Sequence, residues 1–113
     1  MDSSELKNRT KKFAHRSVKL ALALPKNTLG NHVKGQLIRC ATSVAANYRA
    51  ALLAQTKAAF FSKLSIVIEE ADESEFWLEF VIVINFYYYE KNGTKKISNQ
   101  QSTIMDHLPI SCS

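Results

Sequence analysis

The sequence predicts an all-α protein: an antiparallel up-and-down helical bundle with three strong helices plus a degenerate or missing fourth. Apolar residues recur at alternating steps of four and three through most of residues 5–86, which is the spacing of one face of a helix. The 113 residues include only three Gly and two Pro, too few for a β chain with many tight turns. Because the connections between the apolar stripes are short, neighbouring helices are expected to run antiparallel.

The first helix is expected from about residue 5 to residue 24. Asp2 and Glu5 stand three residues apart, as in a capping box whose side chains accept hydrogen bonds from free backbone N–H groups. Pro25 ends the helix, because the residue before a proline is pushed out of the α region. The expected apolar stripe comprises Leu6, Thr10, Phe13, Ser17, Leu20 and Leu24.

The second helix is expected over residues 31–55 and is rich in small side chains, which allow close approach of a neighbouring helix. Its apolar stripe comprises Val33, Leu37, Cys40, Val44, Asn47 or Tyr48, and Ala51. A second, offset apolar line comprises Ile38, Ala45 and Leu52. Two lines require two neighbours, which are either two bundle partners or one bundle partner and a subunit contact.

The third helix is expected over residues 57–86, where a heptad pattern continues for about three repeats. Its stripe comprises Phe60, Leu64, Val67, Ala71, Ser74, Leu78 and Val81. Residues 80–89 have the Val, Ile, Phe and Tyr composition of a strand. The helix is nevertheless extended through residue 86, because Val81, Ile82 and Asn85 continue the pattern. Trp77, on the flank of the stripe, is interpreted as a packing residue.

The predicted organisation is therefore a helical bundle domain over residues 1–90, followed by residues 91–113 as a divergent C-terminal tail or a short fourth helix. Only four residues between 95 and 108 could form an apolar stripe there: Ile97, Ile104, Met105 and Leu108. No run approaches the roughly 20 apolar residues that span a bilayer, and the N-terminus lacks the apolar core of a secretory signal. Two cysteines make no disulfide framework, so a reducing cytoplasm is expected.

No enzymatic centre is evident in the sequence, and neither a metal nor a cofactor is expected. The acidic residues cluster between residues 69 and 79, but a di-metal bundle needs Glu-x-x-His pairs, and no His follows these acids at that spacing. His15, His32 and His107 share no metal-ligand spacing, and His15 is placed on the polar face of the first helix. Cys40 lies on a packing stripe and is interpreted as a small buried hydrophobic residue.

Charge is distributed unevenly along the chain, whose formal net charge is +5. Residues 1–49 contain ten basic and two acidic residues, whereas residues 50–113 contain five basic and eight acidic ones. Such a dipolar surface can steer a polyanion toward one face, or pair the basic face of one subunit with the acidic face of another. The candidate nucleic-acid-binding residues are Lys12, Arg16, Lys19, Lys34, Arg39 and Arg49.

Several motifs in the second and third helices resemble a known family. They are the runs Leu24-Pro25-Lys26, Gln36-Leu37-Ile38-Arg39, Thr42-Ser43-Val44-Ala45-Ala46-Asn47-Tyr48-Arg49, Glu69-Glu70-Ala71-Asp72-Glu73 and Phe76-Trp77-Leu78-Glu79. These motifs resemble the four-helix bundle proteins encoded in intervening sequences of bacterial 23S ribosomal RNA genes, which are related to accessory variability proteins of diversity-generating retroelements.

The resemblance implies a bundle that assembles into a ring, commonly a pentamer. In the retroelement relatives the ring binds nucleic acid and a reverse transcriptase through basic surface. It also implies that Asn47 bonds to a neighbouring helix, that Tyr48 anchors packing and that Arg49 pairs with the acidic third helix. Arg39 and Arg49 are then structural ion-pair partners rather than phosphate ligands. The polar ending after Tyr89 departs from the family's leucine- and glutamate-rich fourth helix, which would leave Phe61 and Ile68 exposed.

The sequence therefore predicts a non-enzymatic protein that forms a ring-like homo-oligomer and binds RNA or DNA through its basic surface. The alternative is a protein-interaction or self-assembly module that binds no nucleic acid, with a further protein as its partner. No membrane partner is expected.

Overall fold

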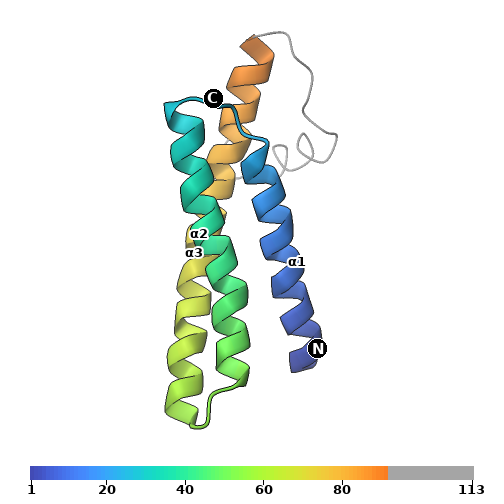
Figure 1. The fold of residues 1–113 in the computed structure, drawn as a ribbon, viewed down its shortest axis with the longest axis vertical. Coiled ribbons are helices and arrows are strands. Elements are labelled where there is room, and N and C mark those ends of the chain that lie inside the picture. Colours follow the sequence, from blue (N-terminus) through green and yellow to red (C-terminus); the bar gives the residue numbers. More distant parts are fainter. Residues whose placement is uncertain (92–113) are drawn as a thin grey trace, which may run out of the picture.

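Three helices make up the part of the chain that the computed structural model describes, residues 1–91. They are α1 (Ser3–Leu22), α2 (Thr28–Leu52) and α3 (Lys57–Lys91), and no strand occurs among these residues. Figure 1 shows α1 and α2 side by side, with α3 returning along α2. The predicted all-α bundle with three strong helices is confirmed. The predicted C-terminal tail or short fourth helix, His107 and Cys112 lie outside the described residues.

Each helix begins at a side chain that accepts a hydrogen bond from a free N–H group of the first turn. Asp2 Oδ1 accepts from Glu5 N at 2.7 Å, as the capping pattern predicts. Asn27 Oδ1 accepts from Gly30 N at 2.7 Å, and Thr56 Oγ1 from Ala59 N at 3.0 Å. The cap at Asn27 explains why α2 begins at Thr28 and not at the predicted residue 31.

The connection between α1 and α2 is tight. α1 ends at Leu22 rather than at the predicted residue 24, and both Leu24 and Pro25 are buried in the loop. A Cβ atom at position 30 would lie 2.0 Å from the carbonyl oxygen of Pro25. The loop can therefore fold back against the first turn of α2 only because residue 30 is glycine.

The middle helix, α2, contributes the largest share of the core, and its predicted stripe is confirmed, with Tyr48 rather than Asn47 at the position left open. Val33, Leu37 and Cys40 are completely buried, and the rest of the stripe is nearly so. A core cluster joins these residues to Ala21 and Leu24 at the end of α1 and to α3. α2 ends at Leu52, three residues before the predicted end.

The packing face of α1 differs from the predicted stripe. Ser17 of that stripe is buried as predicted, but the other buried residues of this helix are Ala14 and Ala21, and Leu6 and Leu20 are exposed. Small side chains let the backbones of α1 and α2 approach closely, so the larger leucines are displaced to the edges of the contact. The prediction for Leu6 and Leu20 is therefore wrong.

The third helix runs to Lys91, five residues beyond the predicted end, and includes the whole segment with strand-like composition. Val67, Ser74 and Val81 of the predicted stripe are buried, whereas Ala71 is exposed. The C-terminal end of α3 projects beyond the loop between α1 and α2 (Figure 1). Phe61 and Ile68 are exposed in the described structure, at 59% and 65%.

A groove separates α1 from α3. α2 packs against both of these helices, but they scarcely touch each other. The hollow between them has a volume of about 580 Å³ and includes Leu6 and Phe13 of α1, Val44 of α2, and Ala71 and Leu78 of α3. None of the helices formed by residues 1–91 combines the length and apolar character that crossing a bilayer requires.

Candidate nucleic-acid interface

Basic side chains dominate the two N-terminal helices. α1 and α2 together carry nine basic residues and one acidic residue, Glu5. The basic residues are Lys7, Arg9, Lys11, Lys12, Arg16, Lys19, Lys34, Arg39 and Arg49. All of them are exposed except Lys34, which is half-buried. Since α1 and α2 pack side by side, the excess of positive charge is concentrated on two adjacent helices.

Three of the predicted site residues lie together on α1. Lys12, Arg16 and Lys19 follow at steps of four and three, and all three are exposed. By helical periodicity they occupy the face opposite the buried residues Ala14 and Ser17. This row of cations therefore faces away from the bundle and has room for an external partner. Lys34 is separated from it on the second helix.

Arg39 has a different role, because it joins α2 to α3. Its Nη1 donates to Glu70 Oε2 at 3.1 Å, and its Nη2 donates to Glu73 Oε2. Nη2 also lies 3.4 Å from Gln36 Oε1. No other basic side chain of α1 or α2 forms an ion pair with a described residue. The structure therefore supports the interpretation of Arg39 as a structural partner and removes it from the free cations.

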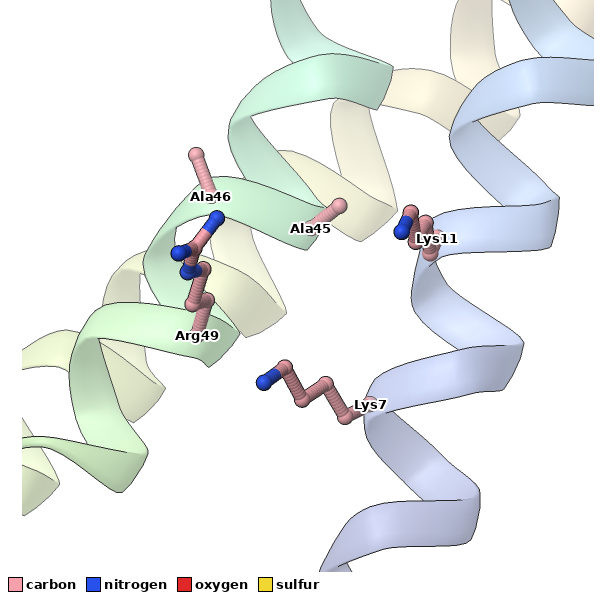
Figure 2. Close-up of a pocket in the computed structure, with 5 residues that line it drawn as sticks. All are labelled: Lys7, Lys11, Ala45, Ala46 and Arg49. Atoms are coloured by element: carbon pink, nitrogen blue, oxygen red, sulfur yellow. The ribbon is translucent and has the colours of Figure 1, made fainter.

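Arg49 does not pair with the acidic third helix, so the role that the resemblance implied for it is wrong. It lies at the seam between α1 and α2, where it lines a notch of about 350 Å³ with Lys7 and Lys11 of α1. Ala45 and Ala46 of α2 complete the lining (Figure 2). None of the five lining residues is acidic. We call this feature the seam notch.

The seam notch contains two cations that the sequence prediction missed. Lys7 and Lys11 are one helical turn apart, as are Ala45 and Arg49, so each helix contributes one short row. Figure 2 shows Lys7 extending from α1 toward α2, with Arg49 on the facing turn of α2. The signal in the sequence was a Lys-x-x-x-Lys row together with adjacent small residues, but only the packing of α1 on α2 brings them together.

Two other residues singled out by the resemblance are placed as follows. Asn47 bonds within its own helix, since its Nδ2 donates to Ser43 O at 3.0 Å and to Ser43 Oγ at 2.8 Å. The predicted bond to a neighbouring helix is therefore not formed. Tyr48 is buried, as predicted, and its hydroxyl lies 3.5 Å from Ser3 O of α1.

Trp77 is a packing residue, as interpreted from its flank position. Its Nε1 donates to Glu73 Oε2 at 3.0 Å, and its ring meets the His32 ring edge-on at a centroid distance of 5.5 Å. Glu73 Oε2 also accepts from Arg39 of α2. Trp77 and Glu73 together therefore link α3 to His32 and Arg39 of α2.

The described cysteine and histidine side chains that remain form no metal-binding cluster with their described neighbours. Cys40 is completely buried and its Sγ lies 3.6 Å from Leu37 O. Burial raises the pKa of the Cys40 thiol above its ordinary range, opposed by a hydrogen bond with Ser74. His15 is exposed. Among the residues that the structure describes, no group of three or more His, Cys, Asp and Glu side chains is arranged to hold a metal ion.

The fold and the surface together define a small helical bundle that carries a row of exposed cations on the outer face of α1 and a cationic notch at the seam between α1 and α2. The chain matches the family described as "23S rRNA-intervening sequence protein" over residues 2–108. It therefore belongs to this family. Comparison with curated proteins and with solved structures gives no significant match.

Proposed function

We propose that this protein binds RNA or DNA, without catalysing a reaction, through the basic surface of α1 and α2. One observation carries the proposal: of the nine cations on these helices, only Arg39 is paired with a carboxylate of residues 1–91. The other eight carry positive charge that no described neighbour compensates directly. Lys and Arg side chains of this kind neutralise phosphates and release their counterions, which gives affinity without reading base sequence. The proposed setting is the cytoplasm.

The proposal includes assembly into a ring-like homo-oligomer, a pentamer by resemblance. Two features support self-association. Exposed apolar side chains occur along α3, among them Phe61, Ile68 and Phe76. In addition, α3 carries seven acidic and three basic residues, the opposite balance to α1. A second copy can therefore bring its basic α1 toward the acidic α3 of the first and cover apolar surface at the same time.

Nucleic-acid binding is tested by filter binding of a structured RNA hairpin to the full chain at a series of salt concentrations. Phosphate contacts require that the logarithm of the association constant falls linearly with the logarithm of the salt concentration. A signal that is absent, or that does not change with salt, contradicts the proposal.

A charge-reversal variant distinguishes this function from self-assembly without nucleic acid. Lys12→Glu, Arg16→Glu and Lys19→Glu are exposed changes on the outer face of α1, so the fold is expected to persist. Loss of RNA binding in the variant supports the nucleic-acid function, and a fall in molar mass beside it agrees with the proposed contact between α1 of one copy and α3 of another. A collapse of the molar mass, in a protein that never bound RNA, supports the self-assembly module instead.

A further inference from the structure

The seam notch concentrates positive charge in a way that nothing in the bundle's packing requires. Lys7, Lys11 and Arg49 all line it, and no acidic side chain does. All three are exposed, and none forms an ion pair with a described residue. Like charges brought to one place repel one another, and a bound anion would relieve this repulsion. By contrast, Arg39 on the same helix has two carboxylate partners.

The shape of the notch fits a compact anion. Ala45 and Ala46 line it on α2, where their short side chains leave a hollow of about 350 Å³. Longer side chains at these two positions would fill the hollow. Lys7 and Lys11 provide three ammonium donors each, and Arg49 adds the planar fork that matches two oxygens of a phosphate.

We propose that the seam notch is a phosphate-binding subsite and that, in line with the nucleic-acid function proposed above, its ligand is a backbone phosphodiester. The site joins α1 to α2, so a phosphate held there contacts both helices at once. A strand anchored in the notch can continue over the exposed outer face of α1, where Lys12 and Arg16 lie. The subsite recognises the charge and tetrahedral oxygens of phosphate and not a base.

The first test removes the charge. The variant Lys7→Gln, Lys11→Gln, Arg49→Gln is compared with the wild type in fluorescence anisotropy titrations of a labelled RNA hairpin between about 50 and 200 mM salt. The control Lys26→Gln, Lys57→Gln, Lys63→Gln removes the same charge from exposed positions outside the notch. We expect the notch variant to bind roughly tenfold or more weakly and its salt slope to fall by about 2 to 3. The control is expected to keep most of the wild-type slope.

The second test fills the hollow without changing the charge. Ala46→Leu places a larger side chain in the notch, whereas Ala58→Leu makes the same change at an exposed position of α3 outside it. We expect Ala46→Leu to weaken RNA binding several-fold and Ala58→Leu to leave it unchanged. Circular dichroism melting of both variants checks that the helices remain folded.

The outcomes separate this inference from the function on which it rests. If the wild type binds RNA but the notch variant matches its charge control, or Ala46→Leu matches Ala58→Leu, the notch is not the subsite although the general function holds. If the wild type binds no RNA, nitrogen-15 NMR titration with inorganic phosphate decides. Shifts confined to the amides of the seam notch then make it a site for free phosphate and overturn the backbone assignment. If these amides do not shift, the seam notch is not a phosphate site.

Discussion

Two glycines of α2 occupy opposite environments. At Gly30 an added Cβ would lie 2.0 Å from Pro25 O, and the residue is buried beneath the loop. At Gly35 an added Cβ would have nothing within 4 Å, and the residue is exposed in the middle of the helix. Neither glycine is required for its backbone dihedrals, so the surroundings alone decide the effect of a substitution.

The matched pair Gly30→Ala and Gly35→Ala is therefore expected to change stability in opposite directions. Gly30→Ala forces the loop away from α2 and is expected to lower the free energy of unfolding by about 1–3 kcal/mol. Gly35→Ala restricts the unfolded chain without strain and is expected to raise it by about 0.4–1 kcal/mol. Urea unfolding followed by circular dichroism measures both, and equal effects of the two changes would contradict the close approach at Gly30.

Cys40 shows how burial can dominate the ionisation of a residue. The thiol is completely buried, and desolvation raises its pKa above the ordinary value of 9.0. The folded state therefore disfavours the thiolate more than the unfolded state does. The resulting contribution to stability is present below about pH 9 and is lost as the pH rises through the folded pKa.

We expect this loss to be visible in the background Cys112→Ser, which leaves Cys40 as the single thiol. The free energy of unfolding in urea should fall more steeply above about pH 9 in this protein than after the additional change Cys40→Ala. The second variant carries every other titrating group and so serves as the control. Parallel pH profiles would mean that Cys40 ionises equally easily in both states.

At the scale of elements, α2 is the scaffold to which the other two helices attach. Ala45 and Ala46 lie at its seam with α1. The contact with α3 includes charged and aromatic groups: Arg39 with Glu70 and Glu73, and His32 with Trp77. The side chain of Arg39 is 50% exposed, so solvent screens its ion pairs and limits their contribution. Their main consequence is to orient Arg39 toward α3 and away from external anions.

Arg39→Gln and Arg49→Gln remove the same charge from one helix and are expected to act differently. Arg39→Gln should lower the free energy of unfolding by less than about 1 kcal/mol, with a smaller effect at high salt, and should leave RNA affinity almost unchanged. Arg49→Gln should weaken RNA binding and reduce the salt slope by about 1 without affecting stability.

Urea unfolding at two salt concentrations and anisotropy titrations measure these two quantities for each variant. Equal losses of RNA affinity in the two variants would show that the ion pairs of Arg39 do not withdraw it from the binding surface.

At the scale of the whole molecule, the charge separation along the sequence becomes a separation in space. The basic helix α1 and the acidic helix α3 lie on either side of α2 and scarcely touch each other. The positive charges of α1 and the negative charges of α3 therefore do not neutralise each other across a direct contact between these two helices. This arrangement leaves both available to partners, and exposed apolar residues of α3 lie near the acidic ones.

Self-association is expected to depend on these apolar residues. Phe61→Ser with Ile68→Ser should lower the molar mass in solution, measured by sedimentation equilibrium, toward that of the 12.7 kDa chain. Because both side chains are exposed, the melting temperature of the monomer should change little. Leu22→Ser with Leu53→Ser, at exposed positions outside α3, provides the control. An unchanged molar mass would remove this face from the assembly.

The periodicity of apolar residues was sufficient to predict the three helices and the buried face of α2. It was not sufficient where the buried face of a helix depends on which side chains the neighbouring helix contacts. The stripe predicted for the first helix correctly included Ser17 and Leu24, but Leu6 and Leu20 were favoured by their hydrophobicity, whereas packing against α2 buries Ala14 and Ala21 instead. In residues 80–89 the helical pattern of Val81, Ile82 and Asn85, all three buried, correctly outweighed the strand-like composition, and only the continuation of α3 from residue 87 to Lys91 was missed.

The sequence by itself determined the all-α fold class, the amphipathic character of the helices and the excess of cations in residues 1–49, because these follow from local periodicity and composition. Only the tertiary structure decided which cations remain free. It paired Arg39 with α3 and gathered Lys7, Lys11 and Arg49 at the seam. The physical reason is that an electrostatic site depends on distances across helices, which are set by how closely small side chains allow two backbones to pack.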